Sequence, residues 1–193
     1  AASAVVVPLA EASPTETPTP APTATAVPTI TPTPNPAFAN KVICLDPGHG
    51  GSDRGYTRAA DATAPAMEEA VVNLAVALKA RDYLRQLGFA VVMTRTTDAD
   101  VNSAGVDVNG DGQTYASLIA TDPVKATRAR QLDELQARIN VCNGAKADLL
   151  LSIHLNGFDD PSVHGYETWF SSARPFVASN RRIAQLVFDQ LGV

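Results

Sequence analysis

The segment Val42–Gly51, with the sequence VICLDPGHGG, constrains the fold of this chain more than any other segment. It begins with a short apolar run rich in β-branched residues, which is typical of a buried strand. Proline cannot donate to a strand ladder and glycine permits a sharp turn, so the strand is predicted to stop at Asp46-Pro47. His49 then lies on a tight loop at the strand's carboxyl end, where open α/β sheets bind ligands. Taken alone, the same pattern also fits an ordinary turn with an incidental histidine.

A proline-rich segment precedes this strand and limits the part of the chain that can fold. Residues 8–36 contain nine of the 14 prolines, interleaved with Thr and Ala. Such a segment buries little apolar surface and has few backbone donors, so residues 1–37 are predicted to be an extended, disordered linker. Residues 38–193 are then the folded domain, which is of ordinary size.

Charge and hydropathy exclude two classes of protein. The net charge is −5 and the chain has no basic block, which argues against nucleic acid as a partner. No apolar run reaches the roughly 18 residues of a membrane span. The apolar start of the chain has no basic region and no initiator Met, so it is either the remainder of a cleaved signal or simply where this sequence begins.

Hydrophobic periodicity predicts alternating helices and strands after a surface loop at 52–64. The predicted elements are helix Pro65–Leu87, strand Phe89–Thr94, helix Val124–Cys142, strand Asp148–Ile153, a half-exposed strand Gly165–Ser171 and helix Ser179–Leu191. This alternation indicates an α/β fold with a mixed, mostly parallel central sheet and helices on both faces. The many charges of the helix at 124–142 are predicted to form a solvent-exposed surface.

The two cysteines, Cys44 and Cys142, lie in a predicted strand and a predicted helix. Their spacing is not that of a metal-binding pair. Because cysteines in such elements often pack in cores, two buried thiols are favoured over a disulfide, although the sequence does not decide between them.

A stretch of the acidic insertion at 98–122 resembles the start of a calcium-binding loop. Asp107, Asn109 and Asp111 supply oxygen atoms at loop positions 1, 3 and 5, and Gly112 follows at position 6. Position 12 is Leu118 instead of a bidentate carboxylate, so the pattern is incomplete. It fits either a calcium site or a solvated turn.

Two histidines follow predicted strands in matching positions. His49 and His154 should emerge at the same edge of a parallel sheet, and one further ligand would complete a catalytic zinc site with a position left for water. Glu68 and Glu69, in the first turn of the intervening helix, are the candidates. Either glutamate could instead complement the helix dipole.

Three separated motifs resemble the zinc-dependent N-acetylmuramoyl-L-alanine amidases of bacterial cell-wall turnover and autolysis, the type 3 amidase family. The motifs are DPGHGG at 46–51, EAVVNL at 69–74 and SIHLN at 152–156, supported by TRT at 94–96, RIN at 138–140 and GYET at 165–168. Counting back from Leu74, the family's zinc-binding glutamate corresponds to Glu69, with Glu68 as the fallback. The resemblance therefore implies one zinc ion bound by His49, Glu69 and His154.

The resemblance also implies a function. The substrate is peptidoglycan, and the bond cleaved is the amide joining N-acetylmuramic acid to L-alanine. The protein is then exported, to an extracellular, periplasmic or cell-wall location, and the linker at 1–37 spaces the domain from a wall-bound or membrane-tethered module. Asn156 is expected to orient His154 or touch substrate, and Asp46 to do the same at His49. His164 is not expected to be a ligand.

In one respect the chain departs from the family. Members use a general-base glutamate on a strand after the helix corresponding to Ser179–Leu191, whereas this sequence stops at Val193 and Glu167 fits a different family position. The domain is therefore expected to be truncated at its C-terminal end. Two alternatives follow: a catalytically impaired wall-binding or regulatory module of the same fold, or a zinc peptidase that cleaves within stem peptides.

Overall fold

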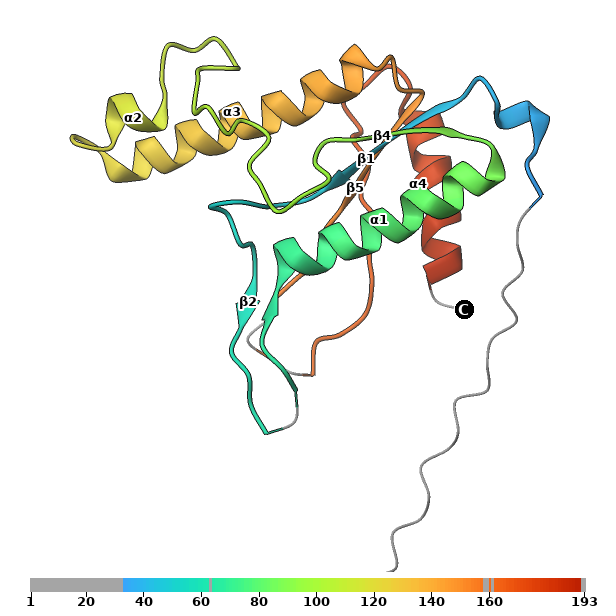
Figure 1. Cartoon of the computed structure of the whole chain (residues 1–193), viewed down its shortest axis with the longest axis horizontal. Coiled ribbons are helices and arrows are strands. Elements are labelled where there is room, and N and C mark those ends of the chain that lie inside the picture. The colour runs from blue at the N-terminus through green and yellow to red at the C-terminus, as the bar shows by residue number, and fades with distance from the viewer. Residues whose placement is uncertain (1–32, 63, 158–159, 161, 192–193) are drawn as a thin grey trace, which may run out of the picture. The chain divides into compact units, whose positions relative to one another are not determined.

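The computed structural model describes residues 33–62, 64–157, 160 and 162–191 (Figure 1). Most of the predicted linker, residues 1–32, lies outside this part. The elements in order are the short helix η1 (Pro36–Phe38), β1 (Val42–Pro47), β2 (Thr57–Arg58), β3 (Met67–Glu68), α1 (Glu69–Leu87), β4 (Ala90–Met93), α2 (Tyr115–Leu118), α3 (Pro123–Gly144), β5 (Leu149–Ile153) and α4 (Val177–Leu191).

The central sheet is parallel, with the strand order β4-β1-β5. The predicted α/β fold is therefore confirmed, and β1 is its central strand. β1 ends at Pro47, within the Asp46-Pro47 stretch where it was predicted to stop, and Pro47 itself still pairs with Ile153 of β5. The missing donor of Pro47 is harmless there, since β4 has already ended and the next N–H, that of Gly48, donates to the Ile153 carbonyl at 2.9 Å.

Side chains of β1 alternate between two covered faces of the sheet. Ile43 and Leu45 form an apolar core with Val91, against which Ala80 and Leu84 of α1 pack. Cys44 and Asp46 face the other way, toward Cys142 and Arg138 of α3. Helices α1 and α3 therefore cover opposite faces, as Figure 1 shows.

The start of α1 differs from the prediction. Residues 65–68 are not helical, because Met67 and Glu68 pair as β3 with β2 in a small antiparallel sheet. The helix begins at Glu69, which places this side chain at the carboxyl edge of the parallel sheet.

The charged surface predicted for α3 is only partly present. Asp133 is 1% exposed and Arg138 is 5% exposed. Asp133 accepts hydrogen bonds from the backbone N–H groups of Val108 and Asn109, which fastens the acidic insertion to α3. Arg138 extends from α3 to β1, where it pairs with Asp46. The charge pattern of the helix did not predict these two contacts, because the hydrogen-bonding partners come from distant segments of the chain.

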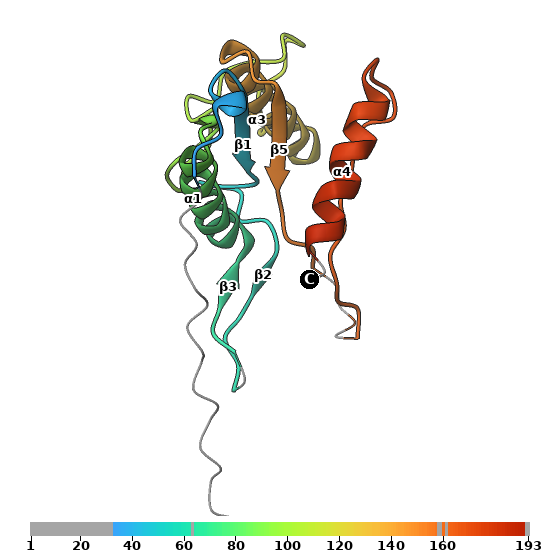
Figure 2. The same cartoon turned by 90° about the vertical axis from the view of Figure 1, so that its right-hand side faces the viewer.

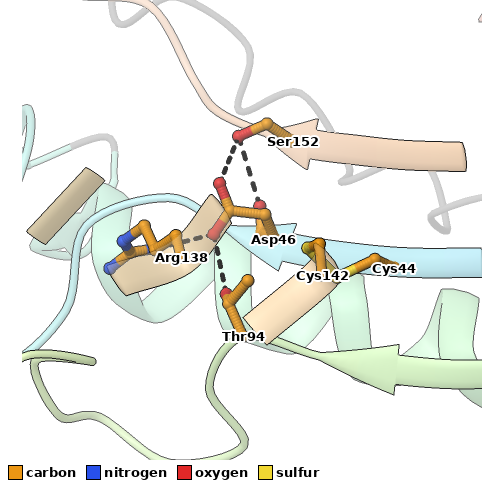
Figure 3. The surroundings of a disulfide bond; sticks show 6 residues. All are labelled: Cys44, Asp46, Thr94, Arg138, Cys142 and Ser152. Atoms are coloured by element: carbon orange, nitrogen blue, oxygen red, sulfur yellow. Dashed lines mark hydrogen bonds and ion pairs between the residues drawn. A yellow bond between two sulfur atoms is a disulfide. The ribbon is translucent and has the colours of Figure 1, made fainter. Parts of the chain in front are cut away.

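The cysteines form a disulfide, so the preference for free thiols was wrong. The Cys44 and Cys142 sulfur atoms are bonded, with Cα atoms 5.5 Å apart (Figure 3). The bond joins β1 to α3 across 98 residues of sequence. The alternation of β1 accounts for this, because it points Cys44 away from the apolar core and at α3.

Figure 2 shows helix α4 beside β5, on the side away from β1. Residues 165–171 do not form the predicted strand, whereas helix α4 is present. Trp169 is 82% exposed, and Tyr166 packs against Phe188 of α4. Within the described part of the chain, no helix has the length and apolar character to cross a bilayer.

Candidate metal centre

The loop after β1 holds His49 in an unusual conformation. Its φ is 59°, in the left-handed region that residues other than glycine seldom adopt. Two buried arginines fix the carbonyl groups around it. Arg95 donates to Pro47 and Gly48, and Arg138 donates to Pro47 and His49. The loop geometry is therefore set by the sheet and by α3, and not by the loop residues alone.

Three predicted ligands converge at this edge of the sheet. His49 follows β1, Glu69 begins α1 and His154 follows β5. Glu69 Oε2 lies 3.2 Å from His49 Nε2, and Glu69 Oε1 lies 3.0 Å from His154 Nδ1. In the described residues these are the one group of His, Cys, Asp or Glu side chains whose ligand atoms converge, all within 4.8 Å of one another.

The donor atoms and their spacing suit zinc. Two ligands at 2.0–2.1 Å from a tetrahedral zinc ion are separated by about 3.3 Å. The two donor separations at Glu69 are close to this value. Two imidazoles and one carboxylate also match a catalytic zinc set that keeps a fourth position for water.

The surroundings of Glu69 hold its carboxylate in place and keep it ionised. The residue is 3% exposed and accepts hydrogen bonds from the backbone N–H groups of Tyr56 and Leu155 and from the Asn73 amide. Burial alone would raise the pKa of Glu69, but these hydrogen bonds and nearby His49 bring the pKa below its ordinary value. Glu69 is therefore held as a carboxylate. Glu68, in contrast, is exposed and pairs with Arg54.

The carboxylate beside Nδ1 of His49 is that of Asp53, which sequence reasoning missed. His49 Nδ1 and Asp53 Oδ2 are 2.9 Å apart, so Asp53 is placed to accept a hydrogen bond from an Nδ1–H group of His49. The signal was present, since Asp53 lies four residues after His49 in the same Gly-rich loop. Asp46 instead binds Thr94, Arg138 and Ser152.

Other predicted residues lie elsewhere. The Asn156 amide donates to Glu167, so a contact with substrate stays a prediction. The His164 ring is hydrogen-bonded to the Ser162 carbonyl in an exposed loop.

The contacts within the acidic insertion do not support the predicted calcium site. Asp107 accepts hydrogen bonds from the backbone N–H groups of Gly110 and Gly112. The side chains of Asn109 and Asp111 are hydrogen-bonded to each other and also accept hydrogen bonds from backbone N–H groups. These contacts are those of a polar turn.

A substitution at Gly48 tests how closely the ligands pack. A Cβ atom there would lie 2.2 Å from Cε1 and 2.3 Å from Nε2 of the His154 ring, so the ring would have to move. We expect Gly48→Ala to weaken zinc binding at least about 10-fold, in the range typical of changes next to metal ligands. The measurement is competition with a chromophoric chelator.

Gly144→Ala is the matched control, because a Cβ atom at Gly144 meets nothing within 4 Å. Equal zinc affinity in the two glycine variants would show that His154 does not need the space above Gly48.

The Asp46 carboxylate should contribute an acid-sensitive part of the stability. Burial alone would raise the pKa of Asp46, but Arg138 and the hydroxyl groups of Thr94 and Ser152 lower it below the ordinary 3.8. Because the folded pKa is the lower one, this stabilisation is complete above the unfolded pKa and is lost as the pH falls through the folded pKa. Denaturant unfolding of metal-free wild type and Asp46→Asn, at about pH 6 and about pH 3, measures it. A loss of stability in acid that is equally large in Asp46→Asn would contradict the assignment.

The comparisons with known proteins point to one family. The model of the N-acetylmuramoyl-L-alanine amidase family matches residues 43–192. A germination-specific N-acetylmuramoyl-L-alanine amidase of Bacillus subtilis is 31% identical over 153 residues, which are 79% of this chain and 53% of the relative. The amidase LytC of B. subtilis is 29% identical, over 78% of this chain and 23% of LytC.

A solved structure agrees with these matches. The CwlD amidase of Clostridioides difficile, determined in complex with the GerS lipoprotein, superimposes with a TM-score of 0.58 at 26% identity, over 79% of this chain and 65% of CwlD. This chain thus spans about half of the first curated relative and about a quarter of the second. The match to the family model covers more than half of the present sequence. The chain belongs to the N-acetylmuramoyl-L-alanine amidase family.

Proposed function

We propose that residues 38–193 form the zinc-binding catalytic domain of an enzyme that hydrolyses the amide bond between N-acetylmuramic acid and L-alanine in peptidoglycan. The observation that carries this proposal is the convergence of His49, Glu69 and His154 within 4.8 Å. The three residues lie in the segments that carry the family motifs, and the model of the amidase family matches residues 43–192.

The chain's own residues prepare the site for this chemistry. An Nδ1–H group of His49 that donates to Asp53 would leave the Nε2 lone pair, which lies on the Glu69 side of the ring, free for the metal. The backbone N–H groups of Tyr56 and Leu155 hold the Glu69 carboxylate in place and ionised. A zinc ion bound there would lower the pKa of its water and polarise the scissile carbonyl.

A cavity beside the ligands offers space for groups next to the scissile bond. Its volume is about 210 Å³, and its lining includes Gly48, His49 and His154. Its lining also includes Ser152 of β5 and Arg138 of α3. The cavity therefore connects the metal ligands to the face of the sheet that α3 covers.

The disulfide supports the proposal that the protein acts outside the cytoplasm. Disulfides such as Cys44–Cys142 persist in oxidising compartments and are rare in reducing ones. An exported location agrees with peptidoglycan as the substrate. The Pro/Thr-rich residues 1–37 are proposed to tether the domain to a wall-bound or membrane-tethered module.

Digestion of purified muropeptides tests the proposal. The complete gene product that contains this chain is expected to release intact stem peptides with a free N-terminal L-alanine, and the matched His154→Ala variant is expected to release none. Mass spectrometry of the products separates the alternatives. Cleavage within the stem would instead identify a peptidase, and binding without release would identify a wall-binding module. Either result would refute the amidase proposal.

A further inference from the structure

The metal ligand His49 has a backbone conformation that its own sequence does not favour. Its φ of 59° lies in the left-handed region. The other described residue of this kind that is not glycine is Lys146, which lies in a turn after α3. Such conformations persist where surrounding contacts over-determine them, and they are frequent at functional sites. The contacts that hold His49 are therefore part of the site.

Arg138 supplies the contact to the His49 backbone. One terminal nitrogen donates to the His49 carbonyl at 2.8 Å, and the other donates to the Pro47 carbonyl at 2.9 Å and to Asp46 at 2.8 Å. Nε and the first terminal nitrogen also donate to Glu134. The buried guanidinium thus has two carboxylate partners for its charge, and its planar geometry fixes the direction of every donor.

The disulfide joins the same two elements that the Arg138–Asp46 ion pair joins. Cys142 lies four residues after Arg138, so both side chains lie on one face of α3. Cys44 lies two residues before Asp46, so both side chains point to one face of β1. Figure 3 shows the disulfide and the ion pair side by side between the strand and the helix. A shift of α3 along β1 would displace Arg138 from the His49 carbonyl, and the disulfide opposes that shift.

Arg95 does not duplicate this arrangement. Its donors reach the carbonyl groups of Pro47, Gly48, Ala70 and Thr97, and none of its hydrogen bonds is to His49. Arg95 also comes from the segment after β4, so its position does not depend on α3.

We propose that Arg138 is a positioning residue for the metal ligand His49, and that the Cys44–Cys142 disulfide keeps Arg138 in register with the ligand loop. Breaking a bond that touches no metal ligand then weakens the metal site through Arg138. The inference rests on the proposed function only in taking zinc as the metal. It adds a residue and a bond that set the affinity for that metal.

Metal affinity and the absorption spectrum of a bound Co²⁺ ion test the inference. The variants are Arg138→Lys, which keeps the charge beside Asp46 but loses the planar fork, and Arg128→Lys as a matched control. Arg128 lies on the same helix and is exposed. Arg138→Lys is expected to lower zinc affinity about 10- to 100-fold and to change the visible Co²⁺ spectrum. Arg128→Lys is expected to change neither.

The disulfide is tested in the same assay. Cys44→Ala/Cys142→Ala is expected to lower zinc affinity with a similar change in the Co²⁺ spectrum, and adding Arg138→Lys to it should cause little further loss. Two losses that multiply would show that the disulfide and Arg138 act independently, which would overturn the proposal. Circular dichroism and thermal unfolding check that each variant is folded.

Two further outcomes are decisive. If Arg138→Lys does not fold, the same assay on wild type with the disulfide reduced and thiols blocked replaces it, and unchanged zinc affinity there would overturn the proposal. Failure of the wild-type chain to bind zinc would refute the proposed function itself. Zinc binding in wild type with equal affinity in Arg138→Lys would refute only the role of Arg138.

Discussion

Replacing Glu69 with alanine is expected to abolish stoichiometric zinc binding, whereas replacing the adjacent Glu68 is expected to leave zinc binding intact. Glu69 is buried, ionised and within 3.0–3.2 Å of nitrogen atoms on both histidines. Its removal leaves two imidazoles, too few for a three-ligand zinc site. Glu68 points away to Arg54, so its loss removes one exposed ion pair.

The two glutamate variants are compared by equilibrium dialysis against zinc followed by metal analysis. The metal-free proteins are compared by thermal unfolding, because Glu69 also accepts two backbone hydrogen bonds that stabilise the fold without metal. Zinc retained by Glu69→Ala and lost from Glu68→Ala would reverse the ligand assignment, and with it the position of the metal relative to α1.

Removing the disulfide is expected to lower the free energy of unfolding by about 3–5 kcal/mol. The bond closes a loop of 98 residues, and loop-closure entropy for a length near 100 corresponds to about 4.7 kcal/mol. Both cysteines are buried, so Cys44→Ala/Cys142→Ala also loses packing of the sulfur atoms. Denaturant unfolding of the metal-free wild type and the double variant measures the difference.

Wild type unfolded in the presence of a reductant is the control for this measurement. It should approach the stability of the double variant, because both then lack the cross-link in the unfolded state. A difference between oxidised wild type and the variant of less than about 1 kcal/mol would show that the bond does little to constrain the unfolded chain.

The features that sequence predicted well are those that depend on local patterns. Apolar runs marked all three strands of the parallel sheet, and the helix between β1 and β4 indicated that these two strands are parallel. The convergence of the candidate ligands was also predictable, because His49 and His154 each follow a strand of one parallel sheet. The same argument placed Glu69 near them, at the start of the helix after β1.

The features that sequence did not predict are those set by contacts between distant segments. Arg138 is buried against β1, and Asp133 is buried against the acidic insertion. Because both partners are distant in sequence, the charges by themselves had suggested solvent exposure. The disulfide required the register of α3 on β1, which no local pattern contains. Residues 165–171 alternate as a strand does, yet in the described structure they make no ladder with β5.

The most direct test of this account is the zinc content of the purified chain and of its His49→Ala/His154→Ala variant, after dialysis against excess zinc. Two imidazoles and the Glu69 carboxylate, brought together from three distant segments, should bind one zinc ion per wild-type chain and none in the variant. A wild-type chain without stoichiometric zinc, or a variant that keeps it, would contradict the metal centre and the hydrolysis proposed for it.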